Sequence, residues 1–244
     1  MLLLLVLLPF GAAFLAACMP PSSRHRPAAV SALATLAALI LAVTQFDRIA
    51  IGEVPQERHP WLPSFGLDII LRMDGLAWVF TIMVLGIGVL VLLYARYYMS
   101  RRDPVARFYA YIMAFMGSML GVVLSGNLIQ LVVFWELTSV TSFLLIGYWQ
   151  ERNDARRGAR MAFTVTTIGG LCMLAGMLLL GQMAGSYELE KVLAAGNAIR
   201  AHDWYLPALM LVALGALTKS AQFPFHFWLP HAMAAPTPVS AYLH

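Results

Sequence analysis

Charged residues are scarce in this sequence. Only 11% of the 244 residues are Asp, Glu, Lys or Arg, while 61% are hydrophobic and the mean hydropathy is +0.76. A soluble domain carries about a quarter charged residues, which solvate its surface. The scarcity excludes a soluble globular fold and predicts an integral membrane protein. The formal net charge of +4 then predicts no nucleic-acid partner, because basic residues in a membrane protein report the side of the bilayer that they occupy.

Cysteine and the familiar catalytic motifs are also scarce or absent. The two cysteines, Cys18 and Cys172, lie in separate apolar runs without CxxC spacing, so we expect them to pack rather than to form a disulfide or bind metal. No HxxxH spacing or His–carboxylate group predicts a transition metal, and the sequence has no nucleotide-binding loop or nucleophile motif. We therefore expect neither an enzyme nor a bound cofactor.

Long apolar runs, in contrast, recur along the chain. A spanning helix needs about 20 mostly apolar residues. Seven runs approach this length: residues 2–19, 28–46, 75–95, 106–124, 127–149, 161–183 and 205–223. The predicted fold class is all-α, a polytopic bundle of transmembrane helices. The first run ends in LAAC (residues 15–18), which resembles a lipoprotein cleavage site, but such signals begin with basic residues and this one does not. We interpret it as a retained helix.

The charges of the loops predict the orientation of the bundle. Ten basic residues and only three acids fall in three loops, at 20–27, 96–107 and 150–160. The two loops that alternate with them, 47–74 and 184–204, hold five basic residues and eight acids. Because short basic loops stay on the cytoplasmic side, this alternation predicts seven spans with the N-terminus outside.

Both outer loops are long enough to contain structure. Residues 61–74 are expected to form a short extended or hairpin element, and residues 187–199 a short surface helix. Neither segment contains a recognisable site.

Two charged residues fall inside the apolar runs, Glu136 and Lys219. Ionisable groups at membrane depth are costly, so they face the protein interior and find partners, and we predict that these two pair. One interpretation is a static ion pair, which would add little stability because desolvation offsets the Coulomb attraction. The other is a contact that opens and closes, so that Lys219 alternately holds and releases a proton as part of a coupled pair. The second interpretation predicts a proton-transfer role.

The segment after Lys219 cannot continue as one regular helix. Pro224 has no N–H, so the carbonyl of Ser220 loses its helical partner. This break falls about one turn from Lys219. Three more prolines follow: Pro230, Pro236 and Pro238. Irregular backbone at membrane depth survives only inside protein or beside a water-filled cavity, and broken helices mark ion sites in transporters. The sequence therefore predicts a proline-broken seventh helix.

Histidines complete the candidate site. Histidine is the usual proton relay near neutral pH. A lone membrane histidine can instead form a hydrogen bond between helices. His226 lies seven residues past Lys219, and His244 belongs to the beginning of another element. His231 lies between these two histidines and has no assigned role. The predicted proton pathway consists of Glu136, Lys219, His226 and His244, with Pro224 as the helix break.

Two blocks of sequence carry a family likeness: FWELTSVTSFLLIGYW (134–149) and TKSAQFPFHFWLPHAMAAPTPVSAYLH (218–244). They resemble the antiporter-like superfamily, which includes the proton-pumping membrane subunits of respiratory complex I and the large A subunits of multisubunit Mrp-type Na⁺/H⁺ antiporters. The stretch SFLLIGYW, the Phe225–His226 pair and PTPVSAYLH are similar to the Mrp branch. The likeness covers the whole chain in layout and is most specific in these two blocks.

The resemblance implies roles for single residues. Glu136 matches the membrane glutamate of the family, Lys219 the lysine of its broken seventh helix, and His244 the histidine of its eighth helix, all on a buried proton path. His226 matches a histidine close to that path, and His231 stands where complex I relatives often have an acid.

The resemblance also implies that residues 1–244 form the N-terminal portion of one proton-translocating membrane domain, with seven spans and the start of an eighth. A chain that stopped about two turns into a helix would leave the helix end in hydrocarbon. We therefore expect this chain to be part of a longer polypeptide.

The implied function is that of a subunit of a multisubunit cation/proton antiporter in the bacterial inner membrane. It would exchange cytoplasmic Na⁺, or Li⁺ or K⁺, for external protons, with the other subunits and the lipid bilayer as partners and no redox cofactor. One rival is a proton-pumping membrane subunit of an NADH:quinone oxidoreductase or a membrane-bound hydrogenase. Another is a scaffold without transport, in which Glu136 and Lys219 only hold helices together.

Overall fold

Helices form most of the molecule, as the all-α prediction requires. A computed structural model describes residues 1–20, 23–62, 67–100 and 103–243. The seven predicted runs all become helices: α1 (Leu2–Ala17), α2 (His25–Val43), α4 (Gly75–Tyr98), α5 (Val105–Val123), α6 (Leu128–Ile146), α7 (Asn153–Ala184) and α10 (Tyr205–Lys219). An apolar segment in lipid adopts this form because a helix satisfies its backbone hydrogen bonds internally.

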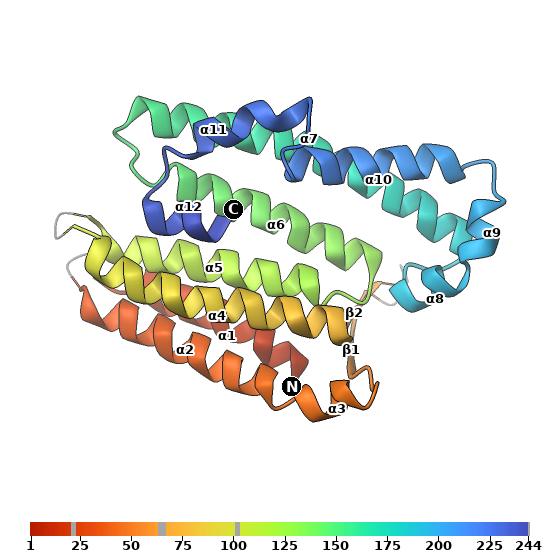
Figure 1. The fold of residues 1–244 in the computed structure, drawn as a ribbon, viewed down its shortest axis with the longest axis horizontal. Coiled ribbons are helices and arrows are strands. Elements are labelled where there is room, and N and C mark those ends of the chain that lie inside the picture. The colour runs from red at the N-terminus through yellow and green to blue at the C-terminus, as the bar shows by residue number, and fades with distance from the viewer. Residues whose placement is uncertain (21–22, 63–66, 101–102, 244) are drawn as a thin grey trace.

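The long helices lie side by side along a common axis, and successive ones run in opposite directions (Figure 1). The first helix, α1, packs on α2 and α5, while α6 packs between α5 and α7. At the other side of the bundle α7 packs against α10 and against the short helix α11 (Trp228–Ala232). These contacts bring the two predicted site blocks together, because α6 carries the first block and α10 and α11 carry the second.

Within the described residues five helices are long and apolar enough to cross a membrane, whereas α1 and α10 are shorter apolar helices. The 15 residues of α10 extend about 22 Å, less than the hydrocarbon core of about 30 Å. A helix of this length that starts at one membrane surface ends within the bilayer. Its last residue is Lys219, which the sequence predicts to lie at membrane depth, and the length of α10 is compatible with that prediction.

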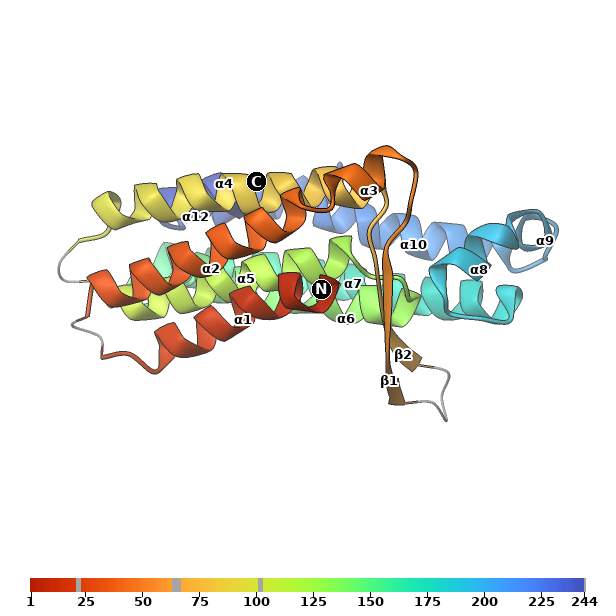
Figure 2. The same cartoon turned by 90° about the horizontal axis from the view of Figure 1, so that it is seen from below.

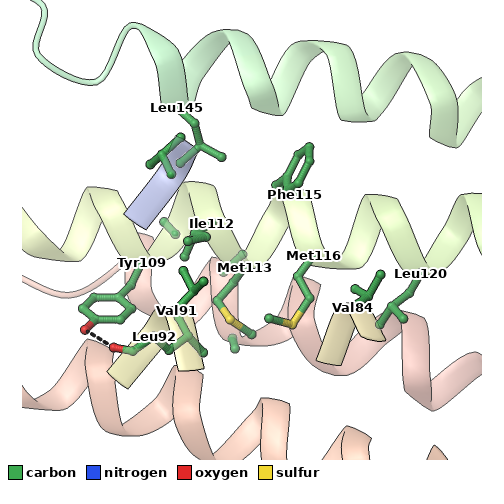
Figure 3. Close-up of a cluster of buried hydrophobic side chains, with 14 of the residues drawn as sticks. Val84, Val91, Leu92, Tyr109, Ile112, Met113, Phe115, Met116, Leu120 and Leu145 are labelled. Atoms are coloured by element: carbon green, nitrogen blue, oxygen red, sulfur yellow. Dashed lines mark hydrogen bonds between the residues drawn. The ribbon is translucent and has the colours of Figure 1, made fainter. Parts of the chain in front are cut away.

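The buried core centres on α5, the most enclosed of the candidate spans. Figure 3 shows Ile112, Met113 and Met116 packed among side chains of the neighbouring helices. Tyr109, also on α5, is fully buried and its hydroxyl donates to the carbonyl of Leu92 on α4, 3.3 Å away (Figure 3). This packing joins α5 to α1, α2, α4 and α6 in one core.

The basic loops meet at one end of the bundle. Arg24 Nη2 donates to the carbonyl of Met99 at 2.5 Å, and Arg107 Nη2 donates to the carbonyl of Tyr148 at 3.0 Å, so each loop contacts the next. The acidic loops lie at the opposite end, with the hairpin (Figure 2). This grouping agrees with the alternation of charge predicted from the sequence.

The hairpin expected at residues 61–74 is present but begins earlier. Strands β1 (Gln56–Leu62) and β2 (Leu67–Arg72) pair in antiparallel register, with Gln56 opposite Arg72. They project at the acidic end of the bundle (Figure 2). The expected single helix at 187–199 is instead two short ones, α8 (Leu189–Ala194) and α9 (Gly196–Arg200). Gly196 lies at their junction, where its low helix propensity favours a break.

An ion pair joins the hairpin to the segment before α8. Arg58 Nη2 lies 2.8 Å from Glu188 Oε2, and Lys191 Nζ lies 3.2 Å from Glu188 Oε1. Burial by itself would raise the pKa of Glu188, but the hydrogen bonds from Arg58 and Lys191 outweigh it and hold the pKa below its ordinary value of 4.5. The folded protein therefore binds a proton at Glu188 less readily than the unfolded chain does.

This difference predicts a pH-dependent contribution to stability. A lowered pKa in the folded state stabilises the fold above the unfolded-state pKa, and the contribution disappears as the pH falls through the folded-state value. Glu188→Gln should lower the free energy of unfolding by less than about 1 kcal/mol at pH 7, and by a smaller amount at pH 3. Thermal melting at both pH values measures this, with the exposed Glu151→Gln as control. An equal effect at both pH values would contradict it.

Candidate functional site

Glu136 lies near the middle of α6. The helix begins after Asn127, whose side-chain oxygen accepts hydrogen bonds from the backbone N–H groups of Ile129 and Gln130, at 2.9 and 3.3 Å. This N-cap satisfies two backbone N–H groups at the start of the helix, and Glu136 lies on the face of α6 that packs against α7. There the carboxylate lies directly against Gly170, where a Cβ atom would overlap Glu136 Oε1. Within the described part of the chain, Oε1 is buried and has no hydrogen-bond partner.

Lys219 reaches the same helix one turn further along. Its Nζ donates to the carbonyl of Trp135 at 3.0 Å, to Thr138 Oγ1 at 2.7 Å and to Ser139 Oγ at 2.6 Å. It also lies 5.2 Å from the centre of the Trp135 ring, within cation–π range. A lysine ammonium has three N–H donors, and here each has an oxygen acceptor. The charge is therefore held by neutral oxygens.

The predicted direct pairing of Glu136 with Lys219 is absent. Among the described residues no carboxylate oxygen lies within 4.0 Å of Lys219 Nζ, although the two groups remain within Coulombic range of each other. The physical reason is that the hydroxyls of Thr138 and Ser139 meet the ammonium first. The arrangement is thus an open one: Glu136 lies on one turn of α6, and the ammonium group of Lys219 from α10 binds hydroxyl groups on the next turn.

The helix break comes earlier than the proline predicts. Helix α10 ends at Lys219, and Ala221 takes a left-handed conformation with φ of 51°. The N–H of Gln222 then bonds the carbonyl of Leu217 at 3.0 Å, and the N–H of Ala221 bonds that of Thr218 at 3.4 Å. This pair of bonds is a Schellman motif. The chain therefore leaves the helix at Ser220, ahead of Pro224.

The segment after the break is irregular, as predicted. Pro224 precedes a 3₁₀ turn (Phe225–Phe227), which leads into α11. The indole Nε1 of Trp228 donates to the carbonyl of Thr218, 3.0 Å away, so α11 is bonded back to the last turn of α10. The chain then enters the short helix α12 (Thr237–Leu243), where the hydroxyl of Tyr242 donates to the carbonyl of Val84 at 2.9 Å.

Of the described histidines in this segment, neither His226 nor His231 joins Glu136 and Lys219. His226 is exposed and stacks on Phe223, with ring centroids 5.8 Å apart. His231 is also exposed, and only its backbone packs closely, against Gly158 of α7. His244 lies outside the described residues. A role for His226 and His244 in the pathway stays a prediction.

A cavity connects Lys219 with the interior of the bundle. It has a volume of about 380 Å³ and lies between the break and helices α4 to α7. Its lining is mainly apolar, but Thr138, Ser142, Thr166 and Lys219 contribute polar groups. This is the chemistry expected of a buried proton route, in which a few hydroxyl and amine groups follow one another in an apolar surrounding.

Sequence reasoning missed several members of this site. Thr138 and Ser139 carry a detectable signal, since they follow Glu136 by two and three residues in an otherwise apolar helix. Gly170 and Trp228 carry no such signal, because their roles depend on which helices become neighbours. Among the described residues no group of three or more His, Cys, Asp or Glu side chains could hold a metal ion.

Two family models match the chain. One, described as NADH:quinone oxidoreductase/Mrp antiporter, TM, covers residues 125–244, and the other, described as NADH-Ubiquinone oxidoreductase (complex I), chain 5 N-terminus, covers residues 61–109. Together they match more than half of the chain. The first includes the whole of the site described above.

Curated relatives are similar along most of the chain. A probable K(+)/H(+) antiporter A/B subunit of Rhizobium meliloti is 57% identical over 239 residues, which are 98% of this chain and 24% of the relative. The A subunit of a Na(+)/H(+) antiporter of Alkalihalophilus pseudofirmus is 49% identical over 194 residues, which are 79% of this chain and 24% of the relative. The chain thus spans about a quarter of the length of these relatives.

Solved structures share the fold. The Mrp complex from Dietzia sp. DQ12-45-1b contains a chain that aligns with a TM-score of 0.86 and 36% identity, over 100% of this chain and 26% of that one. Respiratory complex I from Thermus thermophilus with bound NADH aligns with a TM-score of 0.83 over 100% of this chain and 49% of its own, at 23% identity. The second likeness is one of fold alone.

Proposed function

This chain belongs to the antiporter-like family of membrane subunits that Mrp antiporters share with NADH:quinone oxidoreductase, and from this premise we propose that it forms the N-terminal part of an antiporter A subunit. In this proposal residues 1–244 are one portion of a proton-translocating domain of a multisubunit complex in the bacterial inner membrane. The complex exchanges a monovalent cation for protons. The named relatives are described with K⁺ or Na⁺, and sodium is the cation that we propose here.

One observation supports the proton route above all. Lys219 ends a helix too short to cross the bilayer, and its ammonium group is held by oxygens of the helix that carries Glu136. Because those oxygens are neutral, the Lys219 ammonium can give up its proton, and the resulting neutral amine then has no unpaired carboxylate in contact with it. Thr138 and Ser139 are the hydroxyls through which the proton passes, and the adjoining cavity supplies the space for further relay groups. Further members of the proposed route are His226 and His244.

The proposal is tested with the full-length gene and the genes of its accompanying subunits, in everted membrane vesicles of a host without other antiporters. Respiration on NADH acidifies the vesicle interior, and added Na⁺ or K⁺ should then collapse the pH gradient. Vesicles that lack only this gene should show no cation-dependent collapse. Equal collapse with and without the gene would refute antiport.

The same vesicles distinguish the rival function. A membrane subunit of a redox complex would change the rate at which NADH oxidation builds the gradient, before any cation is added. We expect that rate to be unchanged when the gene is deleted. A fall in that rate would favour the redox complex.

A further inference from the structure

A second cavity lies at the basic end of the bundle, far along the helices from the acidic end. It has a volume of about 550 Å³ and is lined by residues of three helices and the loop that joins two of them. Arg24 and His25 come from the start of α2, Arg96 and Tyr97 from the end of α4, and buried Tyr109 from α5. The proposed proton route uses none of these residues.

The charge of this cavity is positive and unneutralised. Among the described residues neither Arg24 nor Arg96 has a carboxylate within 4.0 Å, and the described lining of the cavity contains no acid. The single acid of the loop between α4 and α5, Asp103, already accepts hydrogen bonds from the backbone of Ser100 and from the indole of Trp149. Two guanidinium groups therefore face the cavity with their charge available.

The position of Arg24 is fixed by the backbone. Its Nη2 donates to the carbonyl of Met99 at 2.5 Å and to that of Arg96 at 3.5 Å. A guanidinium group has five N–H donors, so donors remain for a ligand. Arg24 is also the N-cap of α2, and the first turn of that 19-residue helix contains no acid and no side-chain cap. The backbone N–H groups at the N-terminus of α2, together with the dipole of that helix, add to the attraction for an anion.

Aromatic side chains place the cavity at the level of lipid headgroups. Tyr94, Tyr97 and Tyr98 of α4 are all exposed, with Tyr97 at 78%. Exposed tyrosines at the end of a spanning helix form the belt that sits at the membrane–water interface. A basic cavity between transmembrane helices at that level has the chemistry that binds anionic headgroups.

We infer that this cavity binds the phosphate group of an anionic phospholipid, such as phosphatidylglycerol. Arg24 and Arg96 contact the phosphate oxygens, and the phenolic group of Tyr97 lies beside the glycerol portion. The inference does not depend on the proposed transport function, since it concerns a different end of the bundle.

Native mass spectrometry of the delipidated full complex tests the inference. Phosphatidylglycerol or phosphatidylcholine is added to unsubstituted complex and to the Arg24→Gln/Arg96→Gln double variant. We expect phosphatidylglycerol affinity to fall by about fivefold for each arginine removed, with phosphatidylcholine binding unchanged. The matched control is Arg26→Gln, because Arg26 is exposed at the same end but does not line the cavity. Equal loss in the control, or none in the double variant, would overturn the inference.

Two further arms guard the result. The double variant loses the Arg24 contact to Met99, which could disturb the fold, whereas Arg96→Gln alone keeps it. Arg96→Gln should lower the affinity about fivefold, and Arg96→Lys should keep most of the affinity of the unsubstituted complex. Inorganic phosphate distinguishes a lipid from a soluble anion. Phosphate that binds in an arginine-dependent way, while phosphatidylglycerol does not, would overturn the lipid assignment.

Discussion

Replacing Lys219 with alanine should abolish cation-dependent proton exchange by the full complex, lowering its rate by at least about 100-fold. The substitution removes the group that we propose to carry the proton. It should leave the fold intact, because Thr138 and Ser139 keep a partner when the ammonium is gone. Both hydroxyls already donate to the carbonyl of Trp135, at 2.6 and 3.4 Å.

The measurement is the cation-dependent collapse of the pH gradient in everted vesicles, with the amount of assembled complex determined in parallel. The matched control is Lys191→Ala, which alters the chain's other lysine, exposed in α8. Exchange that persists at half the normal rate or more in the Lys219 variant would refute the proton route.

A second variant separates transport from a purely structural role. In the scaffold alternative Lys219 only holds helices, and an apolar side chain of similar length should then serve as well. In that case the Lys219→Met variant would retain full function. We expect it to assemble normally and to remain inactive, since methionine has no proton to transfer.

Replacing Gly170 with alanine should lower the exchange rate by about tenfold or more, without any change in a titratable group. A Cβ atom at this position would overlap Oε1 of Glu136 and lie 2.6 Å from its Cδ, so the carboxylate must move. Displacement of a reacting group by about 1 Å can cost up to about 100-fold in rate. Alanine favours helix over glycine by about 1 kcal/mol, so α7 itself should not be weakened.

A double variant tests whether displacement of the Glu136 carboxylate causes the effect of Gly170→Ala. In the double variant Gly170→Ala/Glu136→Asp the shorter acid clears the new methyl group, so the two effects should be less than additive. The control is Gly86→Ala in α4, because a Cβ there has no neighbour within 4 Å. Additive effects, or equal losses at Gly86 and Gly170, would show that the position of the Glu136 carboxylate does not limit exchange.

Much of the architecture could be predicted from the sequence, because a membrane constrains it so strongly. Every apolar run becomes a helix, and the two ends of the bundle separate the basic from the acidic loops. Boundaries were less predictable. The end of α10 is set by the Schellman motif at Ala221, a residue that gives no signal because glycine is usual at that position.

The candidate site was predicted in part. The lone intramembrane charges, Glu136 and Lys219, stand out against an apolar background, so composition is enough to find them. Their partners depend on packing, which no local pattern contains. The direct contact between them is not formed in this structure for this reason, since Lys219 bonds Thr138 and Ser139 instead of the carboxylate. Gly170 illustrates the same limit, because its role exists only once α7 lies against α6.

The hydrogen bonds at the end of α10 have a consequence for sodium. In many transporters the unwound carbonyls of a broken helix form the coordination shell of the metal ion. Here the carbonyls of Ala216, Leu217 and Thr218 already accept hydrogen bonds from Ser220, Gln222 and Trp228. The ammonium group of Lys219, which extends from the same end of α10 to the oxygens of α6, would repel a second cation. We therefore expect this break to conduct protons and to exclude metal ions, and the exchanged cation to cross the complex by a separate path.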